Sequence, residues 1–499
     1  MIFVLIGKVL AQPVAENSHP DEEASPAKWQ CGGALENAVW QHWEKWGKPY
    51  LVGELLGRRL SQQGDSYALY DAEVSFHNLL AMAQRCRRGE QQRAIAESLR
   101  TVFSLLGPVP SRPEELAWVC RGGDLCNRKL RTLDSEVVLN SVQFLALLTQ
   151  LARDLTSPVE SAAIDDFKRQ TARVVVHHLG RWNSPAARSS LRKRIAATVG
   201  DVKDASSLLF LTDIDLWTIA VYADLAGMLQ REPQLGHDLA LTTTQLAALR
   251  EHAELLLDLL NVRTLKTTRQ VDSRGPEVSL AELDRGFWWR YRDHRYAGYS
   301  RREPPVRCVA DPDDPSQQRM EVVVEAASVP LVADVGWDIS HARRVVHVLE
   351  ALLRNRSALT TVWGVSAARI PGTEDVAALA RQFRFEVWNQ DVDRPLFANY
   401  YSGVNGWYRV AYDNGTGRCR EGYPPFGLSD SFPTGGYATW APLEPILGLL
   451  GRRLYSLTRS SAEADQAFVA QYYRVLSQRA DPRRRALNEL MFWPTLIGN

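Results

Sequence analysis

Apolar residues recur at three- and four-residue spacing along most of this chain, and that spacing constrains the fold more than any other feature. Such spacing is typical of amphipathic α-helices and differs from the alternation of strands. It predicts helices over residues 34–60, 74–83, 137–155, 164–179, 216–229, 246–260, 342–353, 376–383, 443–457 and 462–476. The one strand-like run, at 320–324, lies in a proline-rich insertion of about residues 301–335.

Segments that are apolar nearly all round alternate with segments that have one polar face. The first kind is buried in a folded protein and the second covers it, so the alternation predicts an inner and an outer ring of helices. Inner helices are expected to begin near residues 34, 71, 134, 213, 338 and 434, and outer helices near 91, 159, 242, 373 and 461. A last helix near 482–491 would close the ring. We therefore expect an all-α fold, an (α/α) toroid of about five to six helix hairpins with long loops and a small β-containing insertion.

An internal repeat supports this arrangement. The motif Asp-x-Glu-Val occurs at Asp71 and again at Asp134, and looser copies begin at Asp213 and Asp338. Each copy precedes an apolar helix, where an aspartate is a favoured cap and suits the positive end of the helix dipole. A toroid directs all inner helix starts to one end. Caps and functional groups would therefore gather in the same place.

Length and charge limit the function classes. From the length of 499 residues we expect one repeat domain over residues 29–499. Residues 1–28 are expected to be a signal remnant and a linker. A formal net charge of +1 gives the protein no overall electrostatic attraction for nucleic acid, so no nucleic-acid partner is expected. No stretch approaches the roughly 20 apolar residues of a membrane helix. The sequence leaves the oligomeric state open.

The chain start and the cysteines bear on location. A short apolar run at 2–6 precedes a polar stretch at 16–28, which favours export to the periplasm or the exterior, with the cytoplasm as the alternative. The six cysteines fit no zinc pattern. Cys120 and Cys126 flank Arg-Gly-Gly-Asp-Leu and are predicted to close a small disulfide if the protein is exported.

A long segment, 388–440, is rich in Gly, Asn, Tyr, Trp and Asp. Connections are usually only a few residues, and long ordered loops often carry function. Trp and Tyr combine a flat apolar ring with one polar handle, which suits the face and edge of a sugar. Arg409, Asp413 and Asp430 are candidates here, because a charge in such a setting needs a partner or a ligand.

Two helix starts carry paired polar residues. Asp338 and His341 are three apart and share a helix face, so Asp338 either orients His341 as a general base or is bonded by it as a structural cap. Glu73 lies four residues before His77 on an expected inner helix. Glu136 and Asn140 occupy the matching positions of the next repeat. A carboxylate on an inner helix is costly unless it faces a wet site or a partner.

The chain lacks a phosphate-binding P-loop, a dinucleotide-binding glycine motif, a serine-hydrolase elbow and an H-E-x-x-H zinc motif. We therefore expect no cofactor and no metal. In its alternating helices, acids at inner helix starts and aromatic-rich loops, the chain resembles the α/α-toroid glycoside hydrolases and polysaccharide lyases. This architectural resemblance, from about Ala34 onward, implies a poly- or oligosaccharide substrate.

The first expectation is a glycoside hydrolase that cleaves a poly- or oligosaccharide by general acid/base hydrolysis. The alternatives are a polysaccharide lyase that acts on a uronic-acid glycan by β-elimination, and a non-catalytic glycan-binding or scaffold toroid. Hydrolysis needs two carboxylates across a sugar, and the candidates are Glu73, Glu136, Asp215, Asp338, Asp413 and Asp430. Elimination needs a base beside a group that neutralises a uronate carboxylate. Its candidates are His341, Tyr400, Tyr401, Asn399 and Arg409. The expected substrate-binding residues are His77, Asn140, Trp217, Trp288, Trp337, Arg343, Trp388, Asn399, Tyr400, Tyr401, Asn405, Trp407, Tyr408, Arg409, Tyr423 and Tyr437.

Overall fold

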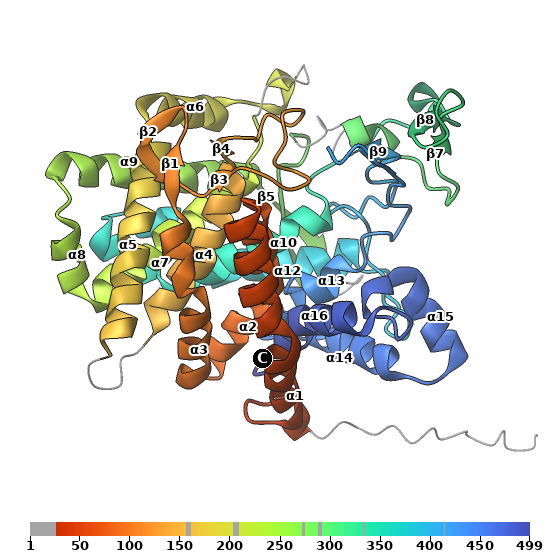
Figure 1. Cartoon of the computed structure of the whole chain (residues 1–499). Helices are drawn as coiled ribbons and strands as arrows, with labels where there is room; N and C mark the ends of the chain where they lie inside the picture. Colours follow the sequence, from red (N-terminus) through yellow and green to blue (C-terminus); the bar gives the residue numbers. More distant parts are fainter. Residues whose placement is uncertain are drawn as a thin grey trace, which may run out of the picture.

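The computed structural model describes residues 26–155, 161–202, 209–271, 275–287, 292–332, 335–413 and 415–499. The protein is mostly helical, with 59% helix, 10% strand and sixteen α-helices in the part described, as expected from the apolar spacing (Figure 1). One hydrophobic core runs from Leu35 to Ile497 and draws on nearly every helix.

Four long helices form the centre of this core: α2 (Tyr67–Arg85), α4 (Val138–Asp154), α7 (Asp213–Arg231) and α10 (Ile339–Arg354). Most residues of α4 and α7 are buried on every side, which explains why their sequences show little polar face. α2 packs against α4, α4 against α7, and α7 against α10. α16 (Pro482–Phe492) packs on α2, and the short α13 (Ser431–Thr434) contacts both α10 and α16.

Amphipathic helices cover the central ones. α3 (Gly89–Leu99) lies on α2, α5 (Ala162–Trp182) on α4, and α9 (Thr243–Arg263) on α7. The buried residues of α5 recur every three or four positions, as its sequence pattern predicts. The remaining helices are α1 (Ala34–His42), α6 (Pro185–Ala196), α8 (Pro233–Leu239), α11 (Arg356–Val362), α12 (Thr373–Gln382), α14 (Pro445–Arg459) and α15 (Glu463–Tyr472).

The strands form five small antiparallel pairs. The pairs are β1 (Gly107–Val109) with β2 (Arg112–Ala117), β3 (Val119–Cys120) with β4 (Ser135–Glu136), β5 (Thr264–Gln270) with β6 (Glu277–Leu283), β7 (Val306–Ala310) with β8 (Gln318–Val322), and β9 (Tyr412–Asp413) with β10 (Cys419–Arg420). The predicted insertion contains β7 and β8, which extend away from the central helices (Figure 1). The β5–β6 hairpin was not predicted, because β5 is polar and exposed and has no apolar alternation.

The prediction that four aspartates cap the central helices is right for one of them. Asp338 accepts hydrogen bonds from the backbone amides of Ser340 and His341 at the start of α10. It is wrong for the other three. Thr212 caps α7, Asp71 lies inside α2, and Asp134 precedes β4 with a left-handed φ of 59°. The two copies of Asp-x-Glu-Val thus have different local structures.

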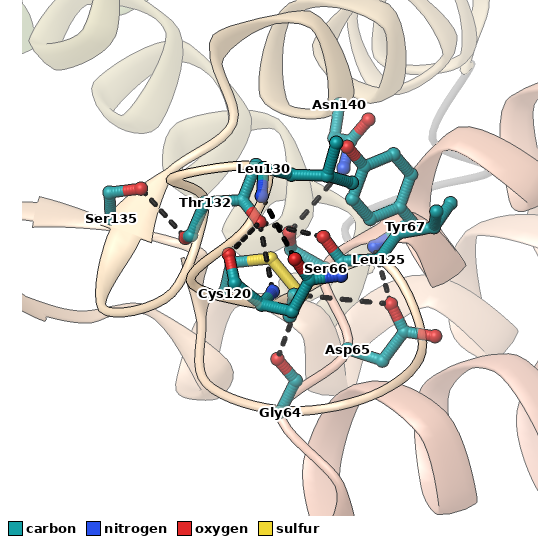
Figure 2. Close-up of a disulfide and its surroundings, with 12 residues drawn as sticks. Gly64, Asp65, Ser66, Tyr67, Cys120, Leu125, Leu130, Thr132, Ser135 and Asn140 are labelled. Carbon is teal, nitrogen blue, oxygen red and sulfur yellow. Dashed lines mark hydrogen bonds between the residues drawn. A yellow bond between two sulfur atoms is a disulfide. The ribbon is translucent and has the colours of Figure 1, made fainter. Parts of the chain in front are cut away.

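Three disulfides link Cys31 to Cys86, Cys120 to Cys126, and Cys308 to Cys419, and no cysteine in the described chain is free. The predicted bond between Cys120 and Cys126 is confirmed (Figure 2). It closes a loop that Thr132 braces from outside, because the Thr132 hydroxyl donates to the carbonyl of Leu125 over 2.6 Å. None of the described helices combines the length and apolar character needed to cross a bilayer.

Loss of a disulfide is expected to destabilise the protein according to the length of chain it encloses. The Cys31–Cys86 bond spans 55 residues and the Cys120–Cys126 bond spans 6. In the loop-entropy model, replacing both cysteines by serine costs about 4 kcal/mol for the longer loop and about 2 kcal/mol for the shorter. Urea unfolding of the two double variants measures the free energy of unfolding that each one loses. Equal losses of free energy in the two variants would contradict the loop-entropy model.

Candidate functional site

The N-terminal ends of the four central helices meet. The amide of Asn140 in α4 lies 3.4 Å from the hydroxyl of Ser66, the cap of α2. From α10, Arg344 donates to the Tyr70 hydroxyl of α2 over 3.1 Å and lies 3.3 Å from the carboxylate of Asp213 in α7. Helix N-termini carry partial positive charge, so this end of the molecule suits anionic groups.

Asp338 and His341 form a dyad at the start of α10. The Asp338 side chain is fully buried, and its Oδ2 lies 2.7 Å from Nδ1 of His341, whose side chain is 21% exposed. Oδ1 meanwhile accepts the Ser340 and His341 amides over 3.0 and 3.1 Å. The aspartate therefore caps the helix and holds the imidazole at the same time.

Charge determines how this dyad is protonated. Burial by itself would raise the pKa of Asp338, but the His341 charge, the bonds from His341 and Ser340, and the nearby Arg409 hold that pKa far below its ordinary value. An ionised Asp338 can only accept, so Nδ1 of His341 carries the proton that points at it. Whenever the imidazole is neutral, its lone pair is therefore on Nε2. This is the tautomer that a histidine base requires.

The 388–440 segment reaches this dyad through Tyr408 and Arg409. The Tyr408 hydroxyl lies 3.3 Å from Nδ1 of His341, and its ring packs edge-on to the imidazole. The guanidinium of Arg409 lies over the rings of Tyr408 and Tyr412, at 5.3 and 5.5 Å from their centres. Arg409 has a left-handed φ of 48°, a strained conformation of the kind that gathers at functional sites.

Glu73 and His77 lie deeper between the helices in a buried polar network. Glu73 bonds Nδ1 of His77 over 2.7 Å and also accepts from Gln143, while Nε2 of His77 contacts Gln150 over 2.5 Å. Trp217 donates to Gln143 over 3.0 Å. The carboxylate is thus satisfied by protein partners on both oxygens.

Glu73, His77 and His347 are the described buried residues whose ligand atoms come close enough to hold a metal, within 4.8 Å of one another. The two imidazoles stack with ring centres 3.7 Å apart. Burial and His77 lower the pKa of His347 well below its ordinary value, so this ring is neutral. Both nitrogens of His77 already have protein partners, and a metal would have to displace one of them.

Glu136 lies apart from Glu73, although the repeat predicts matching positions. It belongs to β4, outside the helix, and its side chain, 3% exposed, points toward α5. There it bonds Arg181 over 2.6 Å and lies 3.4 Å from Nε2 of His178. Burial raises the pKa of Glu136, but His178 and Arg181 outweigh it and lower the pKa to about 2.

The other predicted acids also have partners from different elements. Asp215 accepts from Arg194 over 3.1 Å and from the Thr212 amide over 2.7 Å, so it belongs to the cap of α7. Asp413 is held by Lys129 over 2.7 Å at the surface. Asp430 differs from them, because burial raises its pKa to about 7 against the opposing charges of Arg474 and Arg484.

Most of the predicted aromatic residues hold the backbone together. The hydroxyls of Tyr400, Tyr401 and Tyr437 donate to the carbonyls of Trp407, Leu379 and Ile339 at 3.1, 2.7 and 2.6 Å. Their rings are buried. The indoles donate as well: Trp337 to Asp284, Trp388 to the Asp391 carbonyl and Trp407 to the Arg301 carbonyl. Trp288 lies outside the described residues.

Asn399 and Asn405 shape the loop that carries Tyr408. Asn399 donates to the carbonyls of Gly406 and Pro424, each over 2.8 Å, and Asn405 accepts from the Phe426 amide over 2.8 Å. Tyr423 pairs with Tyr408 through both backbone groups. These residues therefore position the site.

Arg343 is half-buried at the same end, and its charge acts on Asp71 of α2. The structure adds Tyr70, Asp213 and Arg344 to the polar groups there. A double arginine following the Asp338–His341 motif is the one sequence signal that points to Arg344, and nothing in the sequence marks Tyr70.

Replacing Glu136 by glutamine is expected to destabilise the protein by about 3 kcal/mol at neutral pH, because it removes the buried anion beside Arg181 and His178. Arg181 then keeps its ion pair with the less buried Glu115. The carboxylate has a lowered pKa in the folded state, so its contribution is complete above pH 4.5 and is lost as the pH falls toward 2. Unfolding of parent and Glu136→Gln, compared at pH 7 and pH 3.5, measures this. If the difference in unfolding free energy between the two proteins were the same at pH 3.5 as at pH 7, the lowered pKa of Glu136 would be contradicted.

Comparison with known proteins provides no relative. No protein-family model matches the chain, and no curated protein or solved structure matches it either. Because a fold by itself does not establish an activity, the function has to be argued from the geometry around His341.

Proposed function

We propose that this protein is a polysaccharide lyase that cleaves a uronic-acid glycan by β-elimination, with His341 as the base. The observation that carries the proposal is the dyad: a buried, ionised Asp338 bonds Nδ1 of His341 over 2.7 Å, beside Tyr408 and Arg409. His341 is oriented as a base, and Arg409 follows its neighbour Tyr408 in the sequence. This arrangement fits the removal of a proton from a carbon next to a carboxylate.

The reaction balances with these groups alone. Nε2 of His341 takes the proton from the carbon that bears the uronate carboxyl. The electron pair of that C–H bond forms a carbon–carbon double bond, and the bond from the next carbon to the glycosidic oxygen breaks. The proton on His341 is then passed to that leaving oxygen. Asp338 stabilises the imidazolium while it exists, as an aspartate does in a catalytic triad.

Arg409 supplies the positive charge that such a step needs. Removal of a proton beside a carboxylate builds negative charge on the carboxyl oxygens, and a fixed cation stabilises that charge. The rings of Tyr408 and Tyr412 hold the guanidinium in place. The helix N-termini of α2, α4, α7 and α10 add to the same field.

Hydrolysis, the second candidate, is supported by Asp430. Its pKa of about 7 suits a general acid at neutral pH. Hydrolysis also needs a second carboxylate across the sugar. The other predicted acids are engaged by His77, Arg181, Arg194, His341 and Lys129, and elimination is therefore the better-supported reaction.

The toroid and an exported location belong to the same proposal. The packing of α2 on α4, α4 on α7, α7 on α10, and α16 on α2 supports the predicted ring of inner helices. Three disulfides support a periplasmic or extracellular location, where thiols oxidise.

The test is incubation with uronic-acid and neutral polysaccharides, following new reducing ends together with the ultraviolet absorbance of an unsaturated uronate. Elimination raises both signals, and only with the uronic-acid polymers. Reducing ends without absorbance would mean hydrolysis and would overturn the proposal. No signal with any acidic polymer of a broad panel would also count against it.

Two variants examine the dyad. His341→Ala is expected to lower kcat by at least about 100-fold, because it removes the base. Asp338→Asn keeps a good helix cap but loses the charge that sets the tautomer, so a loss of kcat of similar size is expected. Removal of a buried, ionised carboxylate also lowers the melting temperature, so kcat is compared well below the melting temperature of each variant. Tyr400→Phe is the matched control. The Tyr400 hydroxyl donates to the backbone carbonyl of Trp407 over 3.1 Å, and activity should stay within a few-fold.

A further inference from the structure

A cavity of about 670 Å³ lies at the opposite ends of the same four central helices. Each helix has an arginine in its last two positions there: Arg85 ends α2, Arg153 is next to last in α4, Arg231 ends α7 and Arg354 ends α10. Arg87 also lines the cavity. Along α10, this end lies about 20 Å from His341.

Cations suit helix C-termini, and three of these arginines are explained in that way and by ion pairs. Arg354 bonds the buried Asp224 over 2.6 Å. Arg231 bonds Asp154 over 2.7 Å, and Arg153 contacts the same carboxylate. These pairs form the wall of the cavity and need no ligand.

Arg85 and Arg87 are different. Arg85 donates to the carbonyls of Pro494 and Ile497 at 2.7 and 3.2 Å, and no described carboxylate forms an ion pair with it. Burial lowers the pKa of Arg85, with only the charge of Glu350 opposing that effect. Arg87 is exposed at a left-handed φ of 53° and makes no ion pair within the described chain.

The charges around the cavity do not cancel. Five arginines line it, against the lining carboxylates of Asp154 and Glu350 and the buried Asp224 behind Arg354. Among the described side chains this leaves an excess of two positive charges, which faces the partial negative charge of the four helix C-termini. Arg85 and Arg87 have no carboxylate partner in the described chain, and arginine pairs readily with carboxylates through two parallel N–H groups, so these two side chains can bind an anion.

Gln92 adds a second kind of contact. Its side chain is 5% exposed and lines the cavity, and its Nε2 donates to the Ala83 carbonyl over 3.2 Å. Its Oε1 is buried and has no hydrogen-bond donor among the described residues. Buried acceptors without a donor are uncommon, and a ligand hydroxyl would satisfy this one. Ala81 and Leu353 provide apolar wall beside it.

We propose that this cavity is a second ligand site that binds an acidic sugar. The carboxylate would pair with Arg85 and Arg87, and a ring hydroxyl would donate to Oε1 of Gln92. A neutral sugar lacks the first contact, and a simple inorganic anion lacks the second. The site is separate from the dyad at His341, so it stands or falls independently of the proposed lyase activity.

Calorimetric titration of the full chain with glucuronate, glucose and inorganic sulfate tests the proposal. Glucuronate is expected to bind more tightly than either control, with an affinity that falls as salt rises. Arg87→Gln should weaken glucuronate binding about tenfold, the size of one charge-assisted contact. The matched control is Arg319→Gln, an exposed arginine on β8, and it should change nothing.

Gln92→Leu separates the two contacts. It should weaken glucuronate binding while leaving sulfate binding unchanged, with unfolding curves showing that the variant is folded. If Gln92→Leu weakened glucuronate and sulfate binding equally, the proposed contact between Gln92 and a sugar hydroxyl would be overturned. Glucuronate binding that is lost in His341→Ala but kept in Arg87→Gln would put the sugar at the dyad and overturn the second site. No binding of glucuronate at low salt would also overturn it.

Discussion

The hydrogen bonds of Asp338 organise the candidate site more than any other contact. This buried carboxylate caps α10 and fixes His341, and its backbone pairs with Tyr400 in an isolated bridge. The neighbouring backbone also accepts the Tyr401 amide at the carbonyl of Trp337, over 2.7 Å. One residue thereby sets a helix start, a side-chain tautomer and the docking of the aromatic segment. Fully satisfied buried networks of this kind specify one arrangement, because any alternative leaves a charge unpaired.

A second buried network connects the two ends of the central helices. It passes from Trp217 through Gln143 and Glu73 to His77, then through Gln150 to Gln84, which lines the arginine cavity. Every side chain in this hydrogen-bond network lies between helices that are otherwise apolar. Desolvation makes an unpaired polar group there expensive, so the helices hold their rotation and register about this line.

The sequence predicted helices and motifs well and predicted pairings poorly. Helix periodicity is local, and α4, α7 and α10 begin and end within a few residues of their apolar patterns. The Asp338–His341 contact is also local, because three residues make one helical turn. The equivalence of Glu73 and Glu136 failed: a strand replaced the expected helix at Glu136, and Arg181 lies 45 residues further along the chain. The contact of Tyr408 with His341 spans 67 residues and had no signal in either segment.

By itself, the sequence determined the helical class, the buried helices, the small disulfide and the segments that contain the candidate site. Short-range periodicity and spacing set all of these. Only the tertiary structure decided which predicted residues meet. It brought Tyr408 and Arg409 to His341, turned the hydroxyls of Tyr400 and Tyr401 onto backbone carbonyls, and collected four helix-ending arginines around one cavity. Whether a polar side chain serves a site or satisfies the fold depends on the partners that packing supplies. Those partners come from elements far away in the chain.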